Sequence, residues 1–188
     1  MVKTANLEIA VSTFIPLLDS SSNHNNSNSD FKILGPLGCV ASSLAEVTFG
    51  GNGGVDFYDI SLVDGFNLPV RMVPADGFEP GDGHYNCGSA ECVKNINDIC
   101  PDELKVKNDQ GETVACLSAC SHYNTDEYCC RGEHDTPDTC DSSDWDTDYP
   151  NIFKQACPDA YSYAYDDQAS TFTCRGSPLA TYEVTFCP

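Results

Sequence analysis

The sequence predicts a mainly β protein, a β-sandwich interrupted by a disulfide-rich lobe that contains short helices. Three observations support this fold class. The 188 residues include 12 cysteines, 10 of which lie between Cys87 and Cys174. Segments of alternating apolar and polar residues flank that region on both sides, and Gly-rich or Asp-Gly turn signals separate them. The cysteine usage indicates an oxidising compartment, so we expect a secreted protein.

Four segments outside the cysteine-rich region have strand character. Residues 44–49 alternate, residues 55–63 are rich in β-branched and aromatic side chains, and residues 182–186 alternate again. The Asp64-Gly65 pair is a hairpin signal, so we expect residues 66–73 to return as the neighbouring strand.

Two short helices are expected inside the lobe. Residues 113–123 could place Cys116 and Cys120 one turn apart on one helix face. In the second, Asp148 is a natural N-cap and Pro150 an early helix residue, and the helix over 151–156 ends at Cys157-Pro158.

The N-terminal 38 residues differ from the rest. Residues 19–30 are polar and of low complexity, and they contain the single N-glycosylation sequon, Asn25-Asn26-Ser27. The start of the chain is a poor signal peptide, because Glu8 lies in its candidate region and no clean cleavage site follows. We expect residues 1–38 to be disordered or unrelated to the fold.

Zinc is the main alternative use for many cysteines, and structural zinc sites usually show C-x-x-C pairs. No two cysteines here are separated by two residues, and the four histidines are scattered. We therefore favour disulfides and expect no metal and no cofactor.

The charge balance limits the partners. The chain has 29 acidic and 9 basic residues, a net charge of −20. Binding to nucleic acid or to an anionic membrane normally requires a basic patch, so we expect neither. No apolar stretch is long enough to span a bilayer, and we expect a monomer.

Several motifs resemble those of the thaumatin-like family of pathogenesis-related proteins. They are LAEVTF (44–49), DFYDISLVDGFNLPV (56–70), CPDAYSYAYDD (157–167) and YEVTFCP (182–188). The resemblance begins near Leu44 and implies a partial β-sandwich from residues 39–86 and 175–188, with a disulfide-rich lobe at 87–174. The family's N-terminal strands and early disulfide loop find no counterpart, so we expect a truncated or degenerate family member.

The resemblance also implies a disulfide pattern. By family order Cys87 pairs with Cys174, Cys92 with Cys157, Cys100 with Cys116, Cys120 with Cys129, and Cys130 with Cys140. Cys39 and Cys187 are left over, and the family pattern does not decide whether they pair with each other.

Family members carry an acidic cleft, whose acids correspond here to Glu46, Asp59, Asp64 and Asp166. The family's cleft arginine belongs to the part without a counterpart. If the cleft is catalytic, we expect Glu46 to be the general acid and Asp64 the base or nucleophile, since carboxylates in unlike surroundings divide such roles. Asp59 and Asp166 would then bind sugar hydroxyls.

Three aromatic residues near these acids could give stacking surfaces for sugar rings: Phe57, Tyr58 and Phe66. Aromatic residues in strands are more often part of a core, and that alternative stays open at this point.

Three functions are compatible with these features. The first, which we favour, is a defence protein with antifungal character that binds β-1,3-glucan or another cell-wall polysaccharide without turnover. The second is a weak endo-β-1,3-glucanase, and the third is a remnant without independent activity. The absent arginine favours binding over efficient catalysis.

Overall fold

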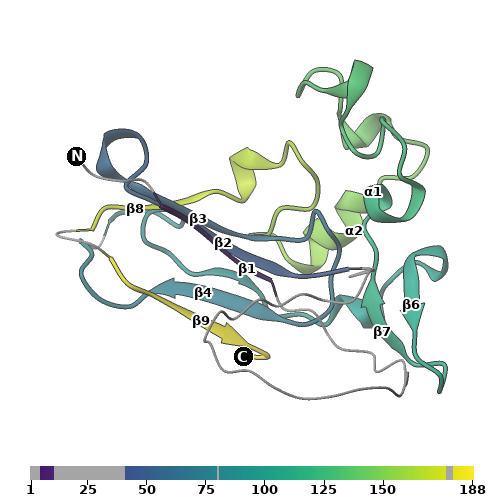
Figure 1. Ribbon diagram of the computed structural model, residues 1–188, viewed down its shortest axis with the longest axis horizontal. Coiled ribbons are helices and arrows are strands. Elements are labelled where there is room, and N and C mark those ends of the chain that lie inside the picture. Colours follow the sequence, from purple (N-terminus) through teal and green to yellow (C-terminus); the bar gives the residue numbers. More distant parts are fainter. Residues whose placement is uncertain (1–4, 11–40, 80, 177–179) are drawn as a thin grey trace, which may run out of the picture.

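The computed structural model describes residues 5–10, 41–79, 81–176 and 180–188, and for residues 5–10 it describes the backbone alone. Two antiparallel sheets face each other, and the cysteine-rich lobe lies beside one end of them (Figure 1). The mainly β fold with short helices is the predicted one.

The first sheet has the strand order β1-β2-β3-β8. Its strands are β1 (Ala5–Ala10), β2 (Leu44–Phe49), β3 (Asp56–Ser61) and β8 (Phe172–Cys174). Residues 5–10 belong to the segment expected to be disordered or unrelated, yet they pair along the whole length of β2. The backbone of β1 provides hydrogen-bond partners for the N–H and C=O groups along that edge of β2. The sequence of residues 5–10 has a weaker strand pattern than the other strands, so this pairing was not predicted.

The second sheet has the order β5-β4-β9 and consists of β5 (Ala90–Cys92), β4 (Val70–Pro74) and β9 (Tyr182–Phe186). The expected hairpin between β3 and β4 is wrong, because these strands belong to different sheets. The turn at Gly65 instead carries the chain across the sandwich. Buried Asn67 fixes this crossing, since its side-chain oxygen accepts from the N–H groups of Ser43 (3.1 Å) and Leu68 (2.8 Å).

The core fills the space between the sheets. Tyr58 is fully buried, and its ring lies 5.5 Å from that of Phe172 and 5.0 Å from that of Tyr182. Other core side chains come from alternate positions along the strands. Ala45 and Ile60, for example, are paired across β2 and β3 and both point into the core.

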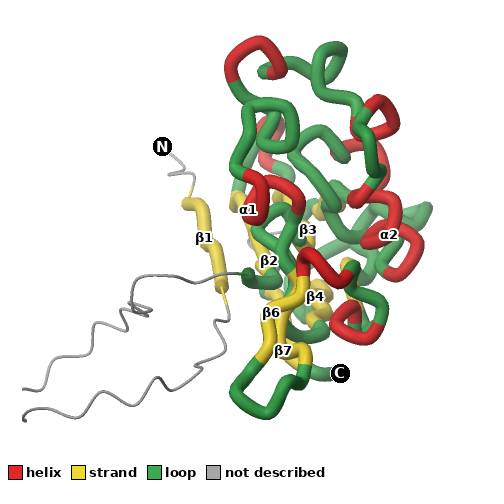
Figure 2. The backbone as a smooth tube through the Cα atoms, turned by 90° about the vertical axis from the view of Figure 1, so that its right-hand side faces the viewer, coloured by secondary structure: helices red, strands yellow, loops and turns green. Residues whose placement is uncertain are grey.

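The lobe contains a two-stranded sheet and two helices, and Figure 2 shows it from the side of the molecule that lies on the right in Figure 1. These elements are β6 (Lys105–Lys107), β7 (Thr113–Cys116), α1 (Ala119–Tyr123) and α2 (Tyr149–Ala156). Short 3-10 turns occur in the lobe and the loops, at Asn52–Gly54, Ile96–Asp98, Asp102–Leu104, Gly132–His134, Ser142–Asp144 and Asp167–Ala169.

One helix prediction is confirmed and the other is partly wrong. Asp148 caps α2 by accepting from the N–H of Asn151 at 3.2 Å, and Pro150 lies in the first turn. Residues 113–116, expected to be helical, form a strand because they pair with β6, and only 119–123 are helical.

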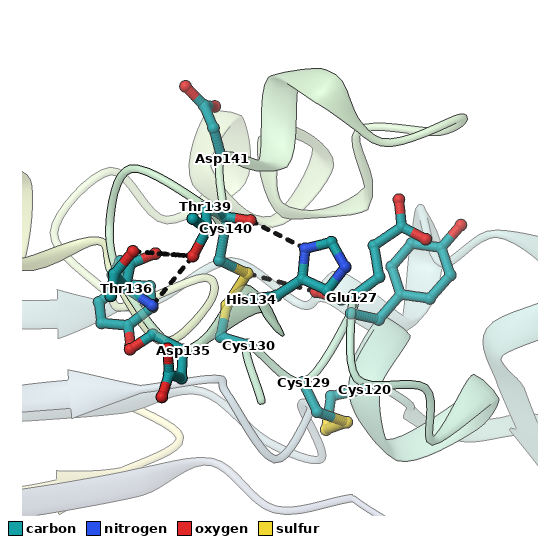
Figure 3. The surroundings of a disulfide bond; sticks show 12 residues. Cys120, Glu127, Cys129, Cys130, His134, Asp135, Thr136, Thr139, Cys140 and Asp141 are labelled. Atoms are coloured by element: carbon teal, nitrogen blue, oxygen red, sulfur yellow. Dashed lines mark hydrogen bonds between the residues drawn. A yellow bond between two sulfur atoms is a disulfide. The ribbon is translucent and has the colours of Figure 1, made fainter. Parts of the chain in front are cut away.

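Five disulfides staple the described chain, and they are the pairs that the resemblance implies: Cys87–Cys174, Cys92–Cys157, Cys100–Cys116, Cys120–Cys129 and Cys130–Cys140. Figure 3 shows the adjacent Cys129 and Cys130 bonded to different partners. Cys187 is exposed and free, and Cys39 lies outside the described residues.

The lobe and the sandwich are joined more closely than the expected boundaries at 87 and 174 suggest. Strands β5 and β8 fall inside that range, but each is part of a sandwich sheet.

Across the described ranges, no helix is long and apolar enough to cross a membrane.

Candidate acidic site

The site is built on the outer face of the first sheet. Glu46 on β2 lies directly opposite Asp59 on β3 in the antiparallel register. Both side chains are half-buried, whereas the neighbouring pair Val47 and Tyr58 points into the core. Directly opposed residues share one face of a sheet and have Cβ atoms about 5 Å apart, so the two acids are neighbours.

The protonated form of Asp59 is favoured at neutral pH. The pKa of its carboxyl is raised to about 8, first by burial and then by the negative charges of Glu46 and Asp167. The buried Oδ1 atom of Asp59 has no hydrogen-bond partner within the described part of the chain. A protonated carboxylic acid at this position can donate a hydrogen bond, which an ionised one cannot.

A third acidic residue arrives from the segment that follows Cys157. Tyr161 runs alongside the end of β3, where its N–H donates to the carbonyl of Ile60 (2.8 Å) and its carbonyl accepts from Leu62 (2.9 Å). The Tyr161 hydroxyl donates to Oδ1 of Asp167 at 2.9 Å and also contacts Thr171. Burial raises the pKa of Tyr161, and the charges of Asp167 and Asp59 add to this effect.

Sequence reasoning missed Asp167 because the family motif points to its neighbour Asp166. The structure gives Asp166 a different environment. Its Oδ2 atom accepts from the N–H (3.0 Å) and the hydroxyl (2.7 Å) of Ser162 and lies 3.0 Å from Nζ of Lys154. Asp166 is thus a paired carboxylate, and the adjacent Asp-Asp sequence was the one signal of a second acid at the site.

Asp64 lies at an exposed turn beyond the end of β3. The turn is closed by the N–H of Gly65, which donates to the carbonyl of Leu62 at 2.8 Å, and the backbone carbonyl of Asp64 accepts from Ser42 at 3.3 Å. The charges that act on Asp59 come from Glu46 and Asp167 rather than from Asp64. The strand register places Glu46 against Asp59, and the bond of Asp167 to Tyr161 brings Asp167 to the end of β3, where its charge acts on Asp59. Asp64 stays at the rim of the site, the exposed turn beyond β3.

A small cavity of about 30 Å³ lies next to this rim. Its lining comes from the end of β3, from both helices and from the segment after Cys157, and includes Val63, Tyr128, Trp145, Phe153 and Tyr163. This is far below the roughly 300 Å³ at which ligand pockets begin, so the cavity does not hold a sugar ring.

The three aromatic candidates differ in their exposure. Phe57 is half-buried and lies opposite Thr48 on the same outer face as Glu46 and Asp59. Tyr58 and Phe66 are both 0% exposed and belong to the core. A fully buried ring has no face for a ligand, so only Phe57 remains a candidate stacking surface.

The arrangement can supply one proton donor and two carboxylate acceptors on one surface. Neutral polyhydroxyl groups are suited to such a surface, because each hydroxyl both donates and accepts hydrogen bonds. A search of the described residues finds no group of three His, Cys, Asp or Glu side chains that could hold a metal ion.

Comparison with known proteins agrees with the fold class. The profile described as "Thaumatin family" matches residues 25–188. The chain belongs to the thaumatin family. It is 56% identical over 146 residues to "Pathogenesis-related protein 5" of Arabidopsis thaliana and 52% identical over 147 residues to "Thaumatin-like protein 1" of Pyrus pyrifolia.

A third thaumatin-family relative, from Prunus avium, bears the name "Glucan endo-1,3-beta-glucosidase" and is 51% identical over 147 residues. Each of these three alignments covers 78% of this chain and 55% of the relative. The chain thus spans about half the length of the curated relatives it matches.

Proposed function

We propose that this thaumatin-family protein binds β-1,3-glucan, or a cell-wall polysaccharide of similar chemistry, on the outer face of β2 and β3. The observation that carries the proposal is the opposed pair Glu46 and Asp59, in which Asp59 stays protonated at neutral pH. The name of the Prunus avium relative supports β-1,3-glucan as the first polysaccharide to test.

In this proposal, Asp59 donates a hydrogen bond to a sugar oxygen. Glu46 and Asp167 accept from sugar hydroxyls, and half-buried Phe57 offers an apolar edge on the same face. The neutral state of Asp59 also lowers the repulsion among the three acids, which would otherwise oppose their closeness.

A second candidate function is weak endo-β-1,3-glucan hydrolysis, which the raised pKa of Asp59 favours. Glycoside hydrolysis requires one carboxylic acid that protonates the leaving oxygen and one carboxylate that attacks or activates water. The acid role, expected for Glu46 from the sequence, suits Asp59 better, and Glu46 or Asp167 would then be the ionised partner. Asp64 stays a candidate only if the substrate reaches the rim.

Secretion belongs to the same proposal. Five disulfides are stable where the surroundings are oxidising, and proteins that meet a cell-wall polysaccharide encounter it outside the cell. A defence role follows only if the polysaccharide is that of an invading organism.

The test compares the parent with Asp59→Ala in pull-down on insoluble β-1,3-glucan and in reducing-sugar release from a soluble β-1,3-glucan. Alanine is chosen because asparagine would keep a side-chain N–H donor at this position. Loss of the donor is expected to weaken binding about tenfold, the effect of a hydrogen bond worth about 1.4 kcal/mol. Parent binding should also weaken above about pH 8, where Asp59 loses its proton.

Glu183→Ala is the matched control, because Glu183 is an exposed strand carboxylate on the other sheet. Binding without sugar release supports the binding function, and sugar release that Asp59→Ala abolishes supports hydrolysis. A parent that neither binds nor cleaves the glucan, or an Asp59→Ala variant that binds as well as the parent, overturns the proposal.

A further inference from the structure

Lys154 on α2 makes an unusually complete set of contacts for a lysine. Its Nζ donates to the carbonyls of Ala160 (3.0 Å) and Ala169 (3.1 Å) and to the hydroxyl of Ser170 (2.7 Å). It also lies 3.0 Å from Oδ2 of Asp166, and its side chain is 22% exposed. Four acceptors surround three ammonium hydrogens, so the cation is enclosed by oxygen atoms.

These acceptors lie at both ends of one segment, residues 160–170. A single ammonium group therefore draws the two ends of the segment together and attaches both to α2. The same segment carries Tyr161 and Asp167, which are joined by a 2.9 Å hydrogen bond and approach Asp59.

The two ends of the segment are held differently. The first end has its own attachment to β3, through the backbone bonds of Tyr161 with Ile60 and Leu62. At the second end, Ala169 and Ser170 are held by Lys154, with a longer contact of 3.4 Å from the Tyr85 hydroxyl to the carbonyl of Ala169. The carbonyl of Asp167 accepts from the N–H groups of Ser170 (3.4 Å) and Thr171 (3.2 Å) at this second end, so Lys154, by holding Ser170, contributes to the placement of Asp167. The hydroxyl of Tyr161 holds the side chain of Asp167 from the first end.

We propose that Lys154 is a positioning residue of the acidic site, which holds the second end of segment 160–170 so that Asp167 meets Tyr161 and faces Asp59. It touches none of Glu46, Asp59 or Asp167 through the contacts described above and acts through the segment it holds. The inference deepens the proposed function, because the glucan surface includes Asp167, but the positioning itself requires no ligand.

Lys154 also separates the roles of two adjacent acids. Its ammonium and Ser162 satisfy Asp166, which leaves Asp167 to act on Asp59. In a chain with 29 acidic residues and 9 basic ones, a cation at this point removes one negative charge from a crowded region.

The test measures the pKa of the Asp59 carboxyl by NMR in the intact, disulfide-bonded protein and in Lys154→Met. Release of the segment moves Asp167 away and exposes Asp59 to water, so we expect the pKa of Asp59 to fall by about one unit. If Lys154 acted only as a nearby positive charge, its removal would raise that pKa instead. The sign of the shift therefore distinguishes positioning from simple electrostatics.

Lys105→Met is the matched control. Lys105 is 23% exposed and pairs with Asp102 at 2.6 Å, so the variant removes an equally buried, paired cation from β6. We expect no change in the pKa of Asp59 in this control. An unchanged or raised pKa in Lys154→Met, or an equal fall in Lys105→Met, overturns the inference.

Ser170→Ala keeps the test decisive if Lys154→Met does not fold. This variant removes the 2.7 Å acceptor and leaves the lysine in place, so we expect a smaller fall in the same direction. Glucan pull-down is measured separately on each variant. A parent that binds no β-1,3-glucan overturns the proposed function, while the Asp59 titration still decides the role of Lys154.

Discussion

Glu46 and Asp59 face each other across β2 and β3, on the surface of the sheet that points away from the core. Two carboxylates at directly opposed positions repel each other when both are ionised. A proton on Asp59, whose pKa is raised to about 8, relieves this repulsion. The first two predictions concern this pair.

We expect stability to decrease with rising pH because of Asp59. Its pKa is about 3.8 when unfolded and about 8 when folded, so the folded state binds more protons between these values. The stabilisation is complete below about pH 4 and is lost as the pH rises toward 8, at a slope of up to about 1.4 kcal/mol per pH unit. Denaturant unfolding of the parent and of Asp59→Asn at several pH values measures this. The stability of the variant relative to the parent should increase with pH, and a constant difference would contradict the assigned proton.

Removing the charge of Glu46 should lower the pKa of Asp59. Of the two neighbouring carboxylates, Glu46 has the larger effect on this pKa and Asp167 the smaller, so the shift in Glu46→Gln should exceed the shift in Asp167→Asn. We expect about one unit for Glu46→Gln by NMR titration. Asp166→Asn is the control, because Lys154 already compensates that carboxylate. An equal or larger shift in the control would show that Asp166 belongs to the acidic group.

Gly65→Ala should destabilise the protein more than an alanine at another glycine of the same backbone conformation. Gly65 has φ 99°, and a Cβ there would lie 2.5 Å from the carbonyl oxygen of Cys116. Gly83 has φ 100° with nothing within 4 Å of such a Cβ. We expect a cost of about 1 kcal/mol for Gly83→Ala and at least about 3 kcal/mol for Gly65→Ala. Similar unfolding midpoints for the two variants would show that the crossing turn relaxes freely.

Removing the Cys87–Cys174 disulfide should cost more than removing Cys130–Cys140. The sequence separations are 87 and 10, and each pair has at least one fully or nearly fully buried cysteine. In the chain-entropy relation, the disulfide that closes the larger ring stabilises the folded state by about 2 kcal/mol more than the other. Double alanine variants compared by denaturant unfolding measure it. A costlier loss of the small ring would mean that local packing in the lobe outweighs ring size.

Much of the strand pattern could be read from the sequence. Residues 44–49 and 182–186 alternate with the period of a half-buried strand and form β2 and β9. The start of α2 could also be predicted, because Asp148 and Pro150 are local signals for a helix start. Such signals depend on neighbours in the chain, which the sequence contains in full.

The prediction of a hairpin at Asp64-Gly65 was wrong because strand pairing does not depend on neighbours in the chain alone. A tight turn between two strand-like segments is compatible with one sheet or with two, and the choice depends on the partners that each strand finds. Here β3 pairs with β2 and β8, while β4 pairs with β5 and β9. Strands β8 and β9 lie more than a hundred residues after the strands they pair with, so no local pattern reveals these pairings.

The sequence by itself determined the family motifs, the cysteine pairs that those motifs imply and the candidate acids Glu46 and Asp59. Only the tertiary structure decided which acids act together. It set Glu46 against Asp59, brought in Asp167 through Tyr161, and paired Asp166 with Lys154. The physical reason is that a pKa depends on burial and on charges within a few ångströms, and both arise when segments distant in the chain pack together.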